Sequence, residues 1–144
     1  MHTNCELCQM TDEKAIWSNE KLRVIAVNDA AFPGYIRVIW KAHVAEMTDL
    51  DENERSLLSK VLFIVESTMR STMKPDKINL AQFGNMVPHL HWHIIARYRD
   101  DSHFPESIWG IKQRDNNPET LLERAQLAEV MQTHLCQELQ QAKL

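Results

Sequence analysis

The chain has 144 residues, of which 44% are hydrophobic and 25% are charged, and its formal net charge is −4 at neutral pH. This composition is typical of one globular domain, and an acidic balance argues against broad nucleic-acid binding, which needs a basic face. The apolar runs, for example residues 61–64, are too short to span a membrane. We expect no secretory signal, because the first residues lack a charged stretch followed by an apolar one. We expect a single cytoplasmic domain over residues 1–144, with neither nucleic acid nor membrane as a partner.

The first predicted elements are strands. Residues 22–27 and 35–40 are rich in β-branched side chains and are separated by a segment that contains Pro33-Gly34, so they are expected to be neighbouring antiparallel strands. Residues 15–17 form a short strand before them.

A long helix is predicted next, because residues 48–74 open with acidic side chains and then carry apolar residues at helical spacing up to Pro75. Residues 77–82 are predicted as a strand, Gly84-Asn85 as a turn, and residues 89–96 as a further strand. Asn117-Pro118 has the residue types of an N-cap and first turn for a final helix. Its apolar stripe comprises Leu121, Ala125, Ala128, Met131, Leu135 and Leu139. Antiparallel strands joined by a long crossover helix indicate an α+β fold.

Three histidines, His89, His91 and His93, alternate with apolar residues in the predicted strand. On a strand this spacing places all three imidazoles on one face and the intervening apolar side chains on the other, core-facing side. Imidazole titrates near neutral pH, so such a row can supply a nucleophile, a proton carrier and an orienting neighbour. The pattern favours chemistry or metal binding over packing.

Two other interpretations of the histidines stay open. They can be ordinary strand histidines, satisfied by solvent or backbone. Alternatively, His91 and His93 can be the ligands of a zinc hydrolase, since a His-x-His pair on a strand can converge on one ion. The first and third rings lie about 13 Å apart along a strand, too far to share that ion easily.

Three cysteines do not make a disulfide framework, but Cys5 and Cys8 have the spacing that lets two thiolates reach one zinc. Alone, this pair is half of a metal site. The alternative is two surface thiols.

The histidine run resembles the signature of the histidine triad (HIT) superfamily of nucleotide hydrolases and transferases. Further matches flank it: Asn28-Asp29, Phe32-Pro33-Gly34-Tyr35, Lys41-Ala42-His43 and Gly84-Asn85. The resemblance covers about residues 5–100 and leaves residues 101–144 as a C-terminal loop and helix. Residues 85–101 resemble a bacterial branch of diadenosine tetraphosphate hydrolase-like proteins. The implied structure is a HIT-like fold, with an antiparallel sheet, a long crossover helix and a C-terminal helix, in a homodimer.

The resemblance implies a nucleotide hydrolase or nucleotidyl transferase that cleaves at the α-phosphate of a (di)nucleoside polyphosphate or a nucleoside phosphoramidate. His91 would attack the α-phosphorus to form a nucleotidyl-histidine intermediate, which water then releases. His93 and His89 would complete the catalytic set, and no cofactor would be required for catalysis. The alternative function is that of a non-catalytic nucleotide-binding protein.

The resemblance also implies a set of substrate contacts. Gln82, Gly84 and Asn85 would approach the phosphates, and Asn28 would meet the ribose hydroxyls. Asn28 can instead be a residue that caps a turn. Met86 departs from the pattern, since it stands where some relatives have a hydroxyl residue that touches the leaving group, and this puts phosphoramidate specificity in question.

In some relatives a cysteine pair joins two histidines at a structural zinc. The matching histidines in this sequence are His43, at the end of the second strand, and His89. The resemblance therefore implies a zinc site formed by Cys5, Cys8, His43 and His89.

Overall fold

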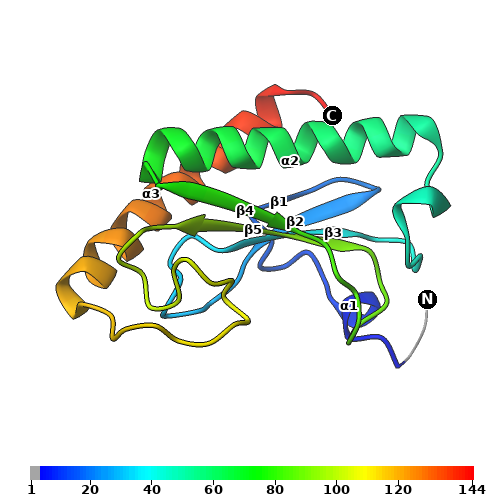
Figure 1. Cartoon of the computed structure of the whole chain (residues 1–144). Coiled ribbons are helices and arrows are strands. Elements are labelled where there is room, and N and C mark those ends of the chain that lie inside the picture. The colour runs from blue at the N-terminus through cyan, green and yellow to red at the C-terminus, as the bar shows by residue number, and fades with distance from the viewer. Residues whose placement is uncertain (1–3) are drawn as a thin grey trace.

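The computed structural model describes residues 4–144 and has an α+β fold, in which two long helices cover one face of a five-stranded antiparallel sheet (Figure 1). The strand order is β1-β2-β3-β5-β4, which confirms the predicted fold class. The strands are β1 (Trp17–Ser18), β2 (Leu22–Ala26), β3 (Ile36–Trp40), β4 (Lys77–Ala81) and β5 (His91–Arg97). The helices are α1 (Glu6–Gln9), α2 (Glu52–Met73) and α3 (Pro118–Gln141), and a 3-10 turn (Met47–Asp49) precedes α2.

Side-chain caps define where the long helices begin. The Asp51 side chain accepts a hydrogen bond from the Glu54 backbone N–H, and the Glu54 carboxylate accepts one from the Asp51 N–H, so two otherwise unpaired donors of α2 are satisfied. The helix ends before Pro75, and α3 begins with Asn117 as N-cap and Pro118 in the first turn, both as predicted. Within residues 4–144, no helix is long and apolar enough to cross a membrane.

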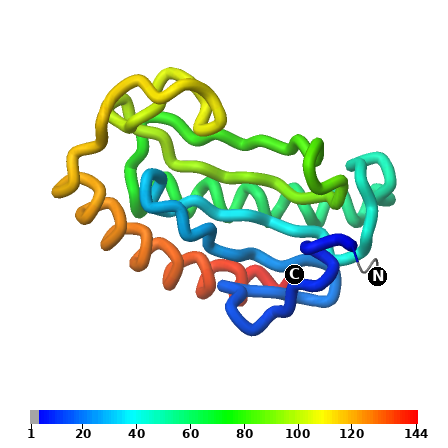
Figure 2. Tube along the Cα trace, turned by 90° about the horizontal axis from the view of Figure 1, so that it is seen from below, coloured from blue at the N-terminus to red at the C-terminus, as the bar shows by residue number. Residues whose placement is uncertain are grey.

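The main core lies between the sheet and the two long helices. In α3 the predicted stripe is buried from Ala128 onward, but Leu121 is half-buried and Ala125 is exposed, so the prediction was wrong for Ala125. The first turns of α3 extend past the ends of the strands and have no sheet to pack against (Figure 2). The fully buried members of this core include Leu22, Val24, Ile36, Val38, Leu58, Val61, Val65, Met69, Ile94, Met131, Leu135 and Leu139.

The predicted strands are confirmed with ends shifted by one or two residues, and the shift matters at His89. Strand β5 begins at His91, where pairing with Ile39 of β3 starts. Before it, Pro88 has no N–H to donate, and the His89 N–H bonds locally to the Val87 carbonyl at 2.8 Å. Strand β5 therefore carries His91 and His93 but not His89, so the prediction of one strand over all three histidines was wrong for His89.

The face of the sheet opposite the long helices is partly covered by the N-terminal segment and by the loop between β5 and α3 (Figure 2). The short helix α1 in that N-terminal segment was not predicted from the sequence. It buries Leu7 and Cys8, which pack against Ile39 of β3. Four residues are too few to show a helical period, so the helix depends on this packing.

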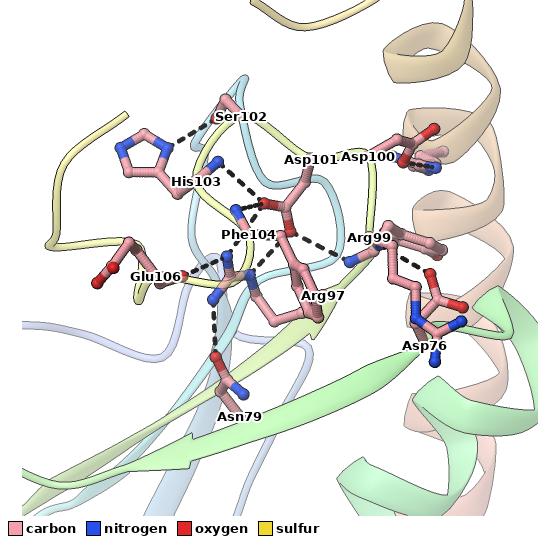
Figure 3. A network of polar contacts seen from close by, with 12 residues as sticks. Asp76, Asn79, Arg97, Arg99, Asp100, Asp101, Ser102, His103, Phe104 and Glu106 are labelled. Atoms are coloured by element: carbon pink, nitrogen blue, oxygen red, sulfur yellow. Dashed lines mark hydrogen bonds and ion pairs between the residues drawn. The ribbon is translucent and has the colours of Figure 1, made fainter. Parts of the chain in front are cut away.

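A buried ion pair anchors the loop after β5 to the sheet (Figure 3). Arg97 is 2% exposed and Asp101 is 3% exposed, and the guanidinium donates to both carboxylate oxygens at 2.8 and 3.0 Å. It also donates to Asn79 Oδ1 on β4 at 2.9 Å and to the Glu106 carbonyl at 2.7 Å. The Asp101 carboxylate further accepts backbone hydrogen bonds from Tyr98, His103 and Phe104.

Replacing Asp101 with asparagine is expected to lower the free energy of unfolding by about 3 kcal/mol, because Arg97 would keep a buried charge without a counter-charge. Urea denaturation of the wild type and the variant measures this difference. Asp115→Asn is the matched control: its side chain is 94% exposed and pairs with Lys112 at the surface, so a change within about 0.5 kcal/mol is expected. Equal stabilities of the two variants would contradict the anchoring role.

Candidate active site

A cavity of about 560 Å³ opens on the sheet face that the long helices leave free. His91 and His93 of β5 and Arg37 of β3 project into it, and the segment between β4 and β5 and the loop after β5 supply its rim. Of the residues predicted to act on a substrate, His91, His93, Gly84 and Asn85 line this cavity.

His91 is oriented by a backbone carbonyl. Its ring is 7% exposed, and its Nδ1 lies 2.5 Å from the His89 carbonyl oxygen. Since a carbonyl can only accept, Nδ1 carries the proton and Nε2 of the neutral ring keeps its lone pair. Burial lowers the pKa of His91, and the positive charge of Arg37 acts in the same direction. The ring is thus held in the neutral, nucleophilic form.

His93 lies beside His91, with 4.9 Å between the ring centroids. Burial, then the positive charge of Arg37, lowers its pKa to about 4. The Tyr35 hydroxyl lies 2.5 Å from His93 Nδ1, and burial raises the pKa of Tyr35, which keeps the phenol protonated. A phenol that donates to Nδ1 leaves Nε2–H of His93 as a donor toward the cavity. Tyr35 belongs to the flanking matches of the sequence, but no role in the site was predicted for it.

Arg37 is the residue of the cavity that sequence reasoning missed. It lies opposite His93 in the β3–β5 register and opposite Ile25 in the β2–β3 register. An arginine within a predicted strand has the pattern of an outward, solvated residue. The strand register is the signal that places it beside the histidines, and that register is a long-range property of the sheet.

Aromatic side chains form part of the cavity rim. Trp109, in the loop after β5, contacts His93 edge to face with 5.0 Å between ring centroids and contacts Phe83 at 5.1 Å. Phe83 and Met86 are 57% and 96% exposed, so the rim offers apolar surface to a ligand.

Two predicted substrate-binding residues lie outside this cavity. Gln82 follows β4 but is not among the lining residues that the structure describes. Asn28 is exposed and lines a second cavity of about 390 Å³, together with Ile25 and residues of the segment after α1. Ile25 of β2, which lines the second cavity, is the cross-strand neighbour of Arg37 of β3, which lines the first. The two cavities are therefore adjacent across the β2–β3 pair.

The four predicted zinc ligands come together from three parts of the chain. Cys5, Cys8, His43 and His89 each offer one ligand atom, and these atoms all lie within 4.8 Å of one another. The Nδ1 atoms of the two histidines are 3.3 Å apart. Cys8 Sγ lies 3.2 Å from His43 Nδ1 and 3.5 Å from His89 Nδ1, and Cys5 Sγ lies 3.4 Å from His89 Nδ1.

These spacings fit a zinc ion. Tetrahedral zinc with its usual bonds to sulfur and nitrogen separates its ligand atoms by roughly 3.3–3.8 Å. His89 is fully buried, and its Nε2 lies against the Trp40 carbonyl, the type of partner that orients a metal-bound imidazole. Burial lowers the pKa of His89 and so favours the neutral form that binds metal. Cys5, Cys8, His43 and His89 therefore could hold a structural metal.

The position of His89 connects this cluster to the cavity. Its ring faces the cysteines, while its carbonyl accepts the hydrogen bond from His91. A zinc hydrolase built on His91 and His93 would need a third ligand side chain beside them. Within residues 4–144, no group of three or more metal-ligand side chains includes these two histidines.

Several known proteins are similar to this chain. The bis(5'-adenosyl)-triphosphatase of Saccharomyces cerevisiae is 33% identical over 73 residues, which are 46% of this chain and only 35% of the yeast protein. A HIT-like protein of Mycoplasma genitalium is 29% identical over 116 residues, 75% of this chain and 78% of that protein. The crystal structure of a histidine triad protein from Bradyrhizobium japonicum superposes with a TM-score of 0.65 at 28% identity, covering 81% of this chain and 88% of the other.

The family match is broader than the match to the yeast enzyme. Residues 9–100 fit the model of the HIT domain, and this segment contains the sheet, helix α2 and the three histidines. Because the match covers more than half of the sequence, the chain belongs to the HIT domain family.

Proposed function

We propose that the chain is a nucleotide hydrolase that acts at the α-phosphate of a dinucleoside polyphosphate. The observation that carries the proposal is the hydrogen bond from His91 Nδ1 to the His89 carbonyl, which leaves Nε2 as a lone-pair donor inside the cavity. The yeast proteins that match part of the chain are named bis(5'-adenosyl)-triphosphatase, which supports this substrate class.

The proposed reaction has two displacements. The lone pair of His91 Nε2 attacks the α-phosphorus, a P–N bond forms, and the bond to the leaving phosphate breaks, with the electron pair going to the leaving oxygen. Water then attacks the same phosphorus, and the P–N bond breaks with its electron pair returning to His91 Nε2. The nucleoside monophosphate leaves with one proton of the water on its new oxygen, and the other proton passes to solvent. Splitting one displacement into two lowers each barrier.

Other residues of the site would bind the substrate. His93 Nε2–H would donate to a phosphate oxygen, and the backbone around Gly84 with the Asn85 side chain would cradle the phosphates. Asn28 would hold the ribose from the neighbouring cavity, and Gln82 would contact the phosphates after a side-chain rearrangement. For His89 we propose that the catalytic contribution comes through its carbonyl, because its ring faces the cysteines.

The test is product formation from diadenosine triphosphate, diadenosine tetraphosphate and adenosine phosphoramidate, each with and without a metal chelator. Release of AMP that resists brief chelation supports the proposal and ranks the leaving groups. Preference for the tetraphosphate would place the chain with the bacterial diadenosine tetraphosphate hydrolase-like branch that it resembles. Tight nucleotide binding with no product from any of the three compounds would favour the non-catalytic binding protein.

The pH dependence of the reaction follows from the lowered pKa values of the two histidines. The active rings are neutral, and a lowered pKa keeps a ring neutral at pH values where free histidine, with a pKa near 6.5, is protonated. We expect the acidic limb of kcat/KM to lie below pH 6.5, because the pKa of each ring is lowered, and the pKa of His93 falls to about 4. Initial rates across the pH range, with circular dichroism to confirm folding, measure this. An acidic limb centred at or above pH 6.5 would contradict the desolvated site.

A further inference from the structure

Arg37 lines the same cavity as the two active-site histidines, and no acidic side chain of the described residues forms an ion pair with it. Its Nε is buried and has no hydrogen-bond partner among residues 4–144. Arg37 also takes part in none of the ion pairs formed within residues 4–144. A buried polar atom without a partner is uncommon in folded proteins and calls for an explanation, such as a ligand that the site is built to receive.

The two buried arginines of the described chain show the usual arrangement. Arg23 is paired with Asp12 at 2.8 Å, and Arg97 is paired with Asp101 at the same distance. Both guanidinium groups therefore have structural counter-charges. The contrast separates Arg37 from arginines that stabilise the fold.

The charge balance of the cavity points to an anion. The described lining residues include a single arginine or lysine, Arg37, and one acidic residue, Glu6, which is exposed at the outer side. Attack on a phosphodiester-like anion builds up negative charge on the phosphoryl oxygens, and Arg37 is the one permanently charged cation among the described lining residues that can balance it.

The position of Arg37 also suits a nucleotide phosphate. It lies between Ile25, which lines the cavity of Asn28, and His93, which lines the cavity of the nucleophile. A nucleoside bound near Asn28 would direct its 5′-phosphate across β3 toward His91. The strand register and the cavity lining place Arg37 between these two positions.

We propose that Arg37 is a catalytic residue that binds the non-bridging oxygens of the phosphate attacked by His91, a role that rests on the proposed function. A guanidinium can donate two parallel hydrogen bonds to phosphate oxygens, so it both neutralises charge and fixes the orientation of the phosphorus. The ligand chemistry assigned to this site is a nucleoside 5′-phosphate, and an uncharged nucleoside would not engage it.

Activity of three variants tests the assignment. Arg37→Ala is expected to lower kcat/KM for a dinucleoside polyphosphate by about 10²–10³-fold, and Arg37→Lys to lie between that variant and the wild type. Millimolar guanidinium ion is expected to restore part of the turnover of Arg37→Ala. Arg99→Ala is the control, since Arg99 is exposed and does not line the cavity, and it is expected to match the wild type with or without guanidinium.

A binding measurement separates this proposal from the hydrolase proposal. By calorimetry, Arg37→Ala is expected to bind AMP at least about tenfold more weakly while its affinity for adenosine stays unchanged. If the wild type turns over no substrate, the hydrolase proposal fails, but this comparison still decides the role of Arg37. Unchanged AMP affinity, or equal losses for AMP and adenosine without guanidinium rescue, would overturn the assignment. If Arg37→Ala does not fold, Arg37→Lys supplies the same comparison.

Discussion

Replacing His91 with alanine is expected to reduce the turnover of a dinucleoside polyphosphate by on the order of 10⁴-fold or more, because the substitution removes the proposed nucleophile. This loss corresponds to about 5 kcal/mol of transition-state stabilisation. The fold is expected to persist, since the His91 ring points into a cavity and its partner is a backbone carbonyl that water can satisfy. Steady-state rates together with a thermal unfolding curve measure both parts of the prediction.

The matched control is His134→Ala, because His134 is exposed on α3 and far from the cavity in the fold. It is expected to keep the wild-type rate. Rapid quenching of the wild type in acid-free denaturant is expected to trap a nucleotide bound to the protein, and the His91 variant is expected to trap none. A folded His91 variant with a rate near that of the wild type would exclude the covalent mechanism.

Removing metal from the purified protein is expected to destabilise it strongly. A zinc ion that binds the folded chain and not the unfolded one contributes about 4 kcal/mol when free zinc is a thousand times its Kd. For a chain of this size such a loss lowers Tm by more than about 10 °C. The reason is that the cluster joins three separate parts of the chain, namely α1, the segment after β3 and the residues before β5. Elemental analysis is expected to find a single zinc per chain.

Cysteine variants locate the effect. Cys5→Ser and Cys8→Ser are expected to lose zinc and stability together, whereas Cys136→Ser is the control, since Cys136 lies on α3 outside the cluster. Zinc removal is also expected to lower kcat, because the His89 carbonyl that orients His91 is held by the same residue that binds the metal. Metal content well below stoichiometry, with Cys5→Ser as stable as the wild type, would exclude the structural zinc.

The parts of the fold that were predictable are those encoded by local patterns. The alternation of β2 and β3, the helical period of α2 and the cap at Asn117 each extend over neighbouring residues, so they are visible along the chain. The four residues of α1 carry no such pattern. Ala125 fits the helical spacing of the apolar stripe in α3, but it lies where α3 extends past the sheet and is therefore exposed. Periodicity predicts which face of a helix is apolar and does not predict how far the partner surface extends.

The candidate site divides in the same way. The histidine spacing and the cysteine pair pointed to the chemistry, because the identities and intervals of these residues are themselves the signal. Tertiary contacts were needed to show that Cys5 meets His89 across 84 positions, that His89 precedes the strand that carries His91, and that Arg37 lies opposite His93. Strand register and chain reversals arise from the packing of distant segments, and a one-residue change in register moves a side chain to the other face of the sheet. The residue types of this site are therefore a property of the sequence, whereas its electrostatics are a property of the packed sheet.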